Sequence, residues 1–286
     1  MSLEASSVLY KYLSGAMEVS RLAHSWEYYD DIASIYDSMY MEPYWILYHL
    51  LTEKLIEDDL KKIGFNSYDG LNVLDLGSGT GRWSIFFALK GAKVWAVDPS
   101  REMLNVQRKK LREYELEDKV QILHARAEVL PFKSGFFDVV NAQGDVLSYV
   151  ENLDVSMREI RRVLKSPGVL LASVDSFYDF ANSMLSGGSL RDFHSLEKLK
   201  MVEIGDLNHS FKTFMSRVFT VEDVKKLEDY GFELLDLAGK VVFGPYDEFF
   251  LAKKMDEILE IEYRYCRVRE LIGKSEHIHF SLVKKE

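Results

Sequence analysis

The segment Val73-Leu74-Asp75-Leu76-Gly77-Ser78-Gly79-Thr80-Gly81-Arg82 decides the fold of this chain. It begins within a short apolar run, Leu71 to Leu76, that is typical of a buried strand, and glycines then occupy alternate positions. Residues Trp83 to Leu89 follow as a predicted helix that Gly91 ends. A glycine-rich turn between a strand and a helix lets a ligand approach the backbone where a Cβ atom would intrude. The segment therefore predicts a nucleotide-type site at the end of a strand.

Gly81 and Arg82 distinguish this turn from the dinucleotide fingerprint. That fingerprint places its third glycine three residues after the second, where this chain has Arg82, and Gly81 comes one residue too early. Asp75, two residues before the first glycine, would repel a pyrophosphate but attract an ammonium group. An NAD(P)-dependent oxidoreductase is therefore disfavoured, and it stays the first alternative function.

Strands and helices continue to alternate beyond the turn. Helices are predicted over Arg101 to Tyr114, with Ser100 as the N-cap, and over Asp154 to Leu164. Because parallel neighbours need a crossover connection, which a helix supplies, this alternation predicts a doubly wound, mostly parallel α/β sheet. The later predicted strands are Lys93–Val97, Val120–Leu123, Phe137–Ala142, Val169–Val174, Phe232–Leu237 and His277–Val283.

Asp98 follows the second strand, where sheets of this type present a carboxylate to ribose hydroxyls. A carboxylate offers two acceptor oxygens and a ribose diol offers two donors, so the pairing is geometrically natural. Asp75 suits an amine, the open glycines suit a small linear chain, and Asp98 suits a diol. Together they describe a nucleoside that carries an amino acid and lacks a pyrophosphate.

Two segments lie outside this alternation. Residues 1–66 are predicted to be an N-terminal helical segment that packs on the core, which is the domain of residues 67–286. A helix from Tyr44 to Ile63 should end near Gly64. Residues 176–218 break the rhythm and are predicted to be a cap insertion. The residues at helical spacing that we expect on one face of the N-terminal segment are Tyr29, Ile32, Ala33, Tyr36 and Tyr40.

Composition narrows the range of partners. The 286 residues include 36 Lys and Arg against 46 Asp and Glu, a net charge of −10, which disfavours a broad nucleic-acid surface. The only cysteine, Cys266, excludes an intrachain disulfide and a cysteine-based metal cage. No long apolar run or signal-peptide pattern is present, so we expect a cytoplasmic protein without a membrane segment.

With these motifs in order, the chain resembles the class I S-adenosylmethionine-dependent methyltransferases. Residues 73–81 resemble that family's first motif, and Val97-Asp98-Pro99-Ser100 with Met103-Leu104 resembles its "VDxSxxML" segment. Residues 127–132, 137–140 and 162–168 follow in the family's order, so the resemblance spans about Leu71 to Asp175. It implies S-adenosyl-L-methionine as the cofactor. It also implies a seven-stranded sheet of order 3-2-1-4-5-7-6 with the seventh strand antiparallel.

The resemblance implies which residues bind this cofactor. Its methionine part would lie over Gly77 and Gly79, with Asp75 holding the amino group, and Asp98 would accept hydrogen bonds from the ribose hydroxyls. Tyr36 is expected to reach the cofactor from the N-terminal segment. The complete expected set is Asp75, Gly77, Ser78, Gly79, Asp98, Pro99, Met103, Ala127, Glu128, Gln143 and Tyr36.

The expected adenine contacts include one departure from the family. Pro99 or Met103 would flank the ring, and Ala127 with Glu128 occupies the place where its edge is read. Many relatives have Asp or Asn immediately before that alanine to accept from the adenine amino group. This chain has Arg126, so the acceptor for the amino group is left open.

The residues after the fourth strand bear on the methyl acceptor. Relatives that methylate nucleobase amines usually carry an Asn/Asp-Pro-Pro-aromatic run where this chain has residues 141–145, and cytosine C5 methylation needs a nucleophilic cysteine nearby. Both are missing, which favours a small-molecule acceptor.

Two further segments refine the resemblance. Residues 143–149 and 175–180 resemble glycine/sarcosine methyltransferases, and residues 29–37 resemble ubiquinone/menaquinone-biosynthesis methyltransferases. Asp145, Tyr149 or His194 could orient or deprotonate an acceptor. No catalytic residue is assigned, no metal is required, and the oligomeric state is left open. A non-catalytic S-adenosylmethionine-binding protein is the second alternative.

Overall fold

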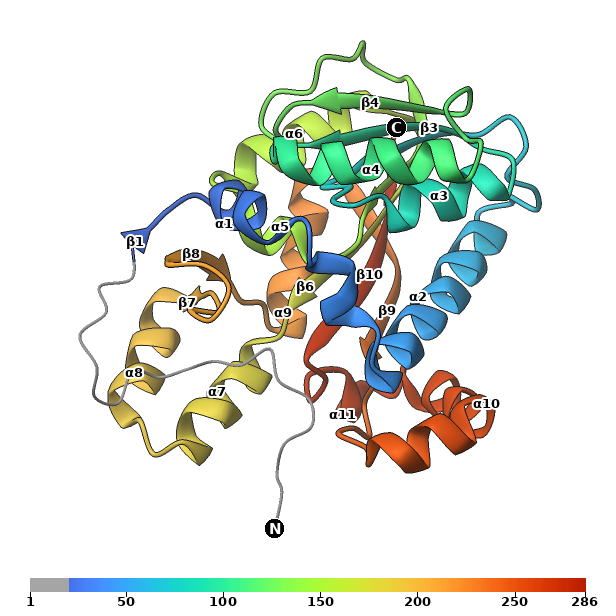
Figure 1. Cartoon of the computed structure of the whole chain (residues 1–286). Helices are drawn as coiled ribbons and strands as arrows, with labels where there is room; N and C mark the ends of the chain where they lie inside the picture. Colours follow the sequence, from blue (N-terminus) through green and yellow to red (C-terminus); the bar gives the residue numbers. More distant parts are fainter. Residues whose placement is uncertain (1–20) are drawn as a thin grey trace.

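The computed structural model describes residues 21–286, so the first 20 residues of the predicted N-terminal segment lie outside the described residues. Its core is a seven-stranded sheet of order β4-β3-β2-β5-β6-β10-β9 (Figure 1). β10 runs antiparallel to both of its neighbours, and the pairs among β2 to β6 are parallel. Counted along the chain within this sheet, the order is 3-2-1-4-5-7-6, and the predicted fold is confirmed. The strands are β2 (Asn72–Leu76), β3 (Lys93–Asp98), β4 (Val120–His124), β5 (Phe137–Ala142), β6 (Leu164–Asp175), β9 (Phe232–Lys240) and β10 (His277–Lys284).

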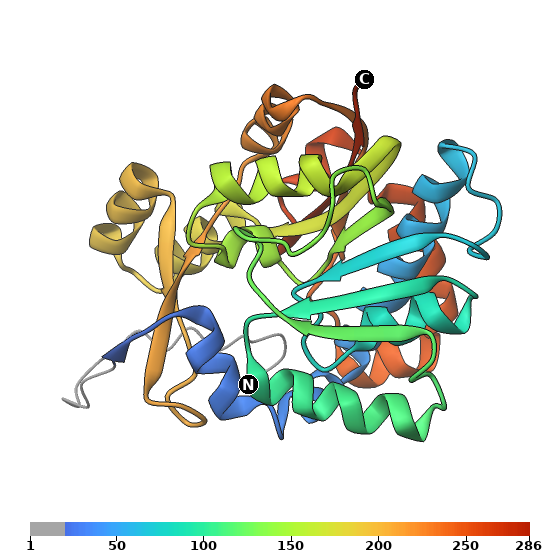
Figure 2. The same cartoon turned by 90° about the horizontal axis from the view of Figure 1, so that it is seen from above.

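Helices cover both faces of the sheet, as Figure 2 shows from above. Because successive strand residues point to opposite faces, Val73 packs among residues of α2 (Pro43–Lys62), α3 (Arg82–Leu89) and α4 (Arg101–Glu113). Leu74 belongs to the opposite core, with α6 (Leu153–Val163), α9 (Val221–Lys225) and α11 (Arg269–Ile272). Burial on both faces explains why these strands are continuously apolar.

The predicted helix ends are present where the sequence placed them. Ser100 Oγ accepts a hydrogen bond from Met103 N at 3.1 Å and caps α4. Thr220 and Asp223 form a reciprocal capping box at the start of α9. Gly64 follows α2 with a φ of +89°, a backbone conformation that favours glycine. These local signals fix where the crossover helices begin and end.

The N-terminal helix is interrupted where a continuous helical face was expected. α1 (Ser25–Ile32) ends before Ala33, and a short 3₁₀ helix, η1 (Tyr36–Tyr40), follows. Asp37 in η1 accepts hydrogen bonds from Thr80 Oγ1 at 2.6 Å and Lys110 Nζ at 2.9 Å, so contacts with the sheet domain anchor the second turn. The tyrosine rings nevertheless meet, because the Tyr29 and Tyr36 centroids lie 6.0 Å apart.

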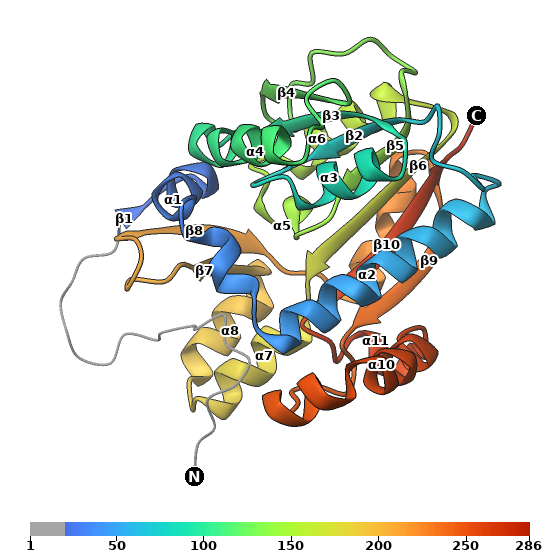
Figure 3. The same ribbon diagram turned by 45° about the vertical axis from the view of Figure 1, so that its right-hand side comes forward.

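The cap is a separate lobe beside the carboxyl ends of the strands (Figures 1 and 3). It contains α7 (Phe177–Ser186), α8 (Leu190–Leu199), β7 (Met201–Ile204) and β8 (Lys212–Arg217). β1 (Arg21–Leu22) adds a parallel strand to β8, which makes a three-stranded sheet. The insertion leaves and returns at one point, because Phe219 N donates to Asp175 O at 2.8 Å and Phe177 N to Phe219 O at 2.9 Å.

The residues between β9 and β10 form helices that the sequence analysis did not assign. α10 (Glu248–Tyr265) packs against α2, and both are visible together in Figure 3. The remaining short elements are α5 (Val146–Tyr149) and η2 (Lys226–Tyr230). In residues 21–286, none of the helices combines the length and apolar character that crossing a membrane needs. The domain division at about residue 66 stays a prediction.

Candidate active site

Two cavities meet at the carboxyl ends of β2 and β5. The smaller, about 100 Å³, lies beside Asp98, Pro99 and Met103, and we call it the turn cavity. The larger, about 200 Å³, has nine Tyr, Trp and Phe residues in its lining, and we call it the aromatic chamber. The cavities adjoin, because six residues line both. These are Tyr29, Tyr36, Gly77, Gly79, Gly144 and Tyr149.

The glycine turn after β2 forms the boundary between the two cavities. Gly77 has a φ of +66°, and a Cβ atom there would lie 2.4 Å from Val146 Cγ2, so the turn needs glycine for packing. Gly79 has a φ of +53°, and a Cβ atom there would meet nothing within 4 Å. The space above Gly79 is therefore an open cradle in which a ligand can contact the backbone. Ser78 lines the aromatic chamber, and its Oγ donates to Gln107 Oε1 at 3.0 Å.

Asp98 ties this turn to the end of β3. Its Oδ2 accepts a hydrogen bond from Gly79 N and its Oδ1 accepts one from Ser100 N, each at 2.8 Å. Each carboxylate oxygen can accept a second hydrogen bond, so capacity remains for two ligand hydroxyls. Burial raises the pKa of Asp98 to about 6, because it disfavours the charged form. Pro99 and Met103 line the same cavity.

Asp75 lies away from both cavity linings. It is buried, accepts hydrogen bonds from Ser84 Oγ at 2.5 Å and Asn141 Nδ2 at 2.9 Å, and joins β2 to α3 and β5. Burial raises its pKa to about 6. These contacts make Asp75 a support of the turn, and its expected contact with a ligand ammonium stays a prediction.

Ala127 and Glu128 line the far end of the turn cavity. Glu128 Oε1 accepts from the backbone N–H of Glu151 at 3.0 Å, which fixes the carboxylate. Arg126 lies with its guanidinium 5.2 Å from the Trp26 ring centroid and pairs with Glu151 at 2.9 Å. An arginine cannot accept a hydrogen bond. Glu128 and Glu151 both line this cavity and carry carboxylates that can accept one.

The aromatic chamber is assembled from distant parts of the chain. Tyr149 lies between the N-terminal segment and the cap, because its ring centroid is 6.2 Å from Tyr29 and 5.2 Å from Phe214. The other aromatic side chains in the lining are Tyr28, Tyr36, Tyr40, Trp45, Tyr48 and Trp83. The sequence analysis named the N-terminal aromatic residues but could not show that the cap completes their enclosure.

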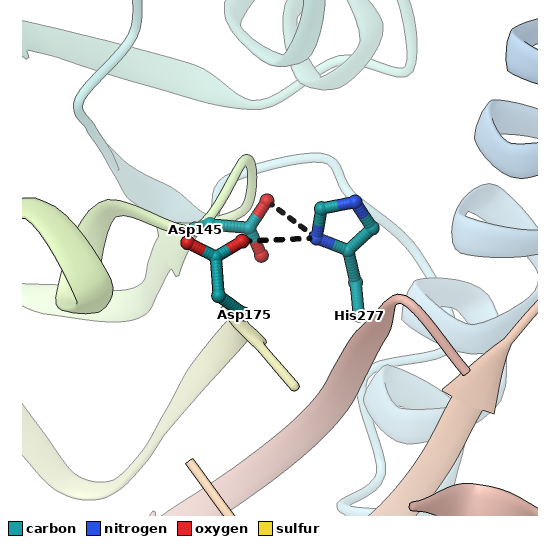
Figure 4. A group of neighbouring side chains, drawn as sticks. All are labelled: Asp145, Asp175 and His277. Carbon is teal, nitrogen blue, oxygen red and sulfur yellow. Dashed lines mark ion pairs between the residues drawn. The ribbon is translucent and has the colours of Figure 1, made fainter. Parts of the chain in front are cut away.

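Asp145, Asp175 and His277 form a buried group in the chamber wall (Figure 4). His277 Nδ1 lies 3.0 Å from Asp145 Oδ2 and 3.5 Å from Asp175 Oδ1. Burial alone would lower the pKa of His277, but the charges of Asp145 and Glu276 raise it well above its usual value. Burial raises the pKa of Asp175 to about 6. Such a group can orient a polar acceptor or take a proton from it.

His277 was missed as a site residue, although a signal for it existed. His277 on β10 and Asp175 on β6 are direct cross-strand partners. The predicted strand order already placed the last strand beside the fifth, and both residues lie at strand ends. Only the register was lacking, and register depends on long-range pairing that a single sequence does not display.

Gln143 faces a buried polar network rather than the turn cavity. Lys240 is fully buried and donates to Gln143 Oε1 and Tyr48 OH, each at 2.9 Å. Gln143 Nε2 lies 3.1 Å from His279 Nδ1, and His279 Nε2 lies 3.0 Å from Asp59 Oδ2. Burial lowers the pKa of Lys240 to about 7, against the opposing effect of Asp145. The structure thus places Gln143 on the chamber side.

Two other residues named in the sequence analysis lie outside the site. The His194 side chain is 69% exposed beside Glu197 and lines neither cavity. Cys266 is buried in the core between α2 and α10, and burial raises the pKa of its thiol to about 11. Neither residue is positioned to act on a ligand in the two cavities.

One protein family matches part of the chain. Residues 74–172, about a third of its length, are similar to the family described as "Methyltransferase domain". Together with the methyltransferases among the relatives below, this match supports the predicted methyltransferase.

The similar proteins match different lengths of the chain. An uncharacterised protein of Methanocaldococcus jannaschii is 28% identical over 228 residues, which cover 78% of this chain and 82% of that protein. Demethylmenaquinone methyltransferase of Listeria welshimeri is 38% identical over 110 residues, and the match covers 37% of this chain and 45% of the relative. A putative S-adenosylmethionine-dependent methyltransferase of Listeria monocytogenes has a similar structure, with a TM-score of 0.57, 22% identity, and coverage of 80% of this chain and 96% of that one. That likeness shows the fold.

Proposed function

We propose that this methyltransferase transfers the methyl group of S-adenosylmethionine to a small molecule held in the aromatic chamber. The observation that carries the proposal is the shared boundary of the two cavities, where Gly77, Gly79 and Gly144 face both. A donor in the turn cavity and an acceptor in the chamber would then meet at that boundary.

The residues of the turn cavity suit the donor. The open backbone at Gly79, next to Gly77 and Ser78, fits its methionine part, and Asp98 fits the ribose diol. The adenine would lie among Pro99, Met103, Ala127 and Glu128, and Tyr36 would cover the cofactor from η1. Roles for Asp75, near the amino group, and Gln143, on the chamber side, belong to the same proposal.

The cofactor supplies a methyl group on a positively charged sulfur, which is already an activated leaving group. The protein's task is to hold the acceptor atom in line with that methyl group and to exclude water. Tyr29, Tyr149 and Phe214 close the chamber around this point. Asp145 and His277 lie in the wall, where they can orient the acceptor.

The acceptor is proposed to be a small molecule with an apolar or aromatic body and at least one polar group. The nine aromatic side chains in the lining fit such a body, and the buried acid and histidine group fits the polar part. The quinone-ring methyltransferases among the relatives support this class. The net charge of −10 supports the absence of a nucleic-acid partner. A cytoplasmic location remains part of the proposal.

Calorimetric titration tests the cofactor. We expect one molecule of S-adenosylhomocysteine to bind per chain and NADH not to bind. Tight NADH binding without a response to S-adenosylhomocysteine would favour the oxidoreductase. A screen of metabolite extracts with a labelled methyl donor tests the transfer, and binding of the cofactor without any labelled product would favour a non-catalytic binding protein.

A further inference from the structure

Asp145, Asp175 and His277 present three donor atoms of the kind that bind metal ions, at one place in the chamber wall (Figure 4). One carboxylate oxygen from each aspartate and one imidazole nitrogen all lie within 4.8 Å of one another. The side chains of all three residues are less than 10% exposed, and all three line the chamber. The donors therefore converge on a shielded point that a ligand in the chamber can reach.

The group is not satisfied by its own contacts. Although His277 Nδ1 lies 3.0 Å from Asp145 Oδ2, neither ring nitrogen makes a hydrogen bond of acceptable geometry with any described residue. Asp145 Oδ1 also lacks a partner among residues 21–286. Buried polar atoms without partners cost about 1–3 kcal/mol each, so native proteins rarely keep them. Three such atoms in one group indicate a site that receives a ligand.

The charge at this point favours a cation. A third carboxylate, Glu276, lies with its Oε1 3.6 Å from His277 Nε2. Three carboxylates thus surround a single imidazole, and the buried amine of Lys240 donates to Tyr48 and Gln143 instead. The carboxylates outnumber the positively charged side chains in this group, so a divalent ion would offset the excess negative charge.

Neighbouring side chains hold the donors in place, as they do around protein metal sites. Ser216 Oγ donates to Asp175 Oδ2, which leaves Oδ1 free toward the histidine. Tyr44 OH donates to Glu276 Oε2 at 2.7 Å, and Glu276 faces the second nitrogen of His277. A carboxylate beside the outer nitrogen of a ligating histidine fixes its tautomer and raises its basicity. Ser216, Tyr44 and Glu276 therefore fix the orientation of two of the three donor residues from outside.

We propose that Asp145, Asp175 and His277 bind one divalent transition-metal ion, such as Zn²⁺ or Mn²⁺, in the wall of the aromatic chamber. The mixture of one imidazole and two carboxylates suits these ions better than Mg²⁺, which prefers oxygen ligands alone. Donors around a tetrahedral zinc ion lie about 3.4 Å apart, close to the 3.0 Å and 3.5 Å separations from His277 Nδ1. The sequence analysis required no metal, and it did not bring these three residues together, which lie far apart in the chain.

The ion's remaining coordination positions face the chamber, and its role there rests on the proposed function. A hydroxyl or enol oxygen of the acceptor would occupy one of them. Coordination lowers the pKa of that oxygen, whose proton passes to solvent. The oxygen then forms the new bond to the methyl carbon, the carbon–sulfur bond breaks, and the bonding pair stays on sulfur. A metal ion at this place therefore favours an acceptor that is methylated on oxygen over one that is a protonated amine.

Metal binding is tested directly on the tag-free, full-length protein after chelator treatment. Calorimetry with Zn²⁺ and with Mn²⁺ should show one ion per chain. His277→Gln and Asp175→Asn should each weaken binding by at least about thirtyfold, because each removes one of three ligands. The matched control is His209→Gln, which removes a histidine that faces one carboxylate, Asp206, at 2.8 Å. Its affinity for the ion should stay within about twofold of wild type.

A second measurement protects the test against misfolded variants. Each variant is titrated with S-adenosylhomocysteine, which reports an intact turn cavity. Pulsed electron paramagnetic resonance of the Mn²⁺-loaded wild-type protein should show one coordinated imidazole nitrogen. No stoichiometric binding, no nitrogen coupling, or unchanged affinity in both ligand variants would overturn the metal site. Failure of the wild-type protein to bind S-adenosylhomocysteine would count against the proposed function alone.

Discussion

The turn cavity and the aromatic chamber share a boundary but are built in different ways. Most residues of the turn cavity come from one stretch of chain, between Leu76 and Glu151. The chamber draws on residues as far apart as Tyr28 and His277, and on the cap between them. The first cavity follows from the sheet's own strand-to-helix turns. The second exists only after three separate regions have come together.

This difference separates the two halves of the proposed reaction. A site built from consecutive turns is specified locally, so its motifs can be shared with many proteins that use the same donor. A site built from long-range packing can change with the packing. The match to the methyltransferase family covers residues 74–172, which include the glycine turn and Asp98 but not the cap or His277. The shared part is the donor side.

The largest expected effect is on the donor side. Asp98→Ala removes the carboxylate that accepts from Gly79 and that, in the proposed function, accepts from the ribose. We expect at least a tenfold weaker affinity for S-adenosylhomocysteine, or about 1.4 kcal/mol, measured by calorimetry. Asp98→Asn keeps the shape of the side chain and loses its charge. Its affinity for S-adenosylhomocysteine should lie between those of the wild type and Asp98→Ala. Equal affinity in all three proteins would show that the ribose lies elsewhere.

Trp45→Leu should act on the other cavity alone. Trp45 lines only the chamber and packs against Tyr40, with ring centroids 4.7 Å apart. Once an acceptor is known, its KM should rise by about fivefold, because an aromatic contact of roughly 1 kcal/mol is lost. The affinity for S-adenosylhomocysteine should stay within about twofold. A comparable loss of both affinities would mean that the two cavities are not separable.

The pH dependence of donor binding should follow Asp98. Its pKa of about 6 means that the carboxylate is charged at pH 8 and protonated at pH 5. A protonated acid accepts fewer hydrogen bonds from a diol, so affinity for S-adenosylhomocysteine should fall about threefold or more as the pH falls through 6. The same titration of Asp98→Asn should be flatter. An equally steep profile in that variant would assign the dependence to another group.

The smallest expected effect is on stability. Burial lowers the pKa of Lys240 to about 7, so between this value and the usual 10.5 the folded chain binds fewer protons than the unfolded chain. Its contribution to stability therefore rises as the pH rises from 7 toward 10, and is lost as the pH falls. Lys240→Met should raise the melting temperature at pH 6 by about 2 °C. It should also reduce the increase in stability between pH 7 and pH 10. A lower melting temperature would show that the bonds to Tyr48 and Gln143 outweigh burial of the charge.

The strand, the glycine turn and the helix cap around the turn cavity were predicted well because their signals are local. The strand run, the alternating glycines and the Ser100 cap each act within a few residues, and all were found where expected. The strand order followed from the family resemblance. The expected contact of Asp75 was harder to judge, because its partners Ser84 and Asn141 lie on other elements.

The acceptor side could be predicted only in outline. The aromatic residues of the N-terminal segment were visible, but η1 interrupts the helix on which they were placed, since Asp37 is held by Thr80 and Lys110. Lys240 and His277 gave no local pattern, because their surroundings are created by the pairing of β10 with its neighbours. A pairing register is a property of the whole sheet, and a single sequence does not state it.

Two hydrogen bonds join Phe219 to Asp175 and Phe177, so the cap begins and ends at one place beside the main sheet. The segment between residues 175 and 219 contains no strand of the seven-stranded sheet, so exchanging it leaves the strand order of that sheet unchanged. Residues 175 and 219 are therefore the junctions at which the cap can be exchanged, in evolution or in the laboratory. Chimaeras joined at residues 175 and 219 would keep the residues of the turn cavity and change the part of the aromatic chamber that the cap supplies.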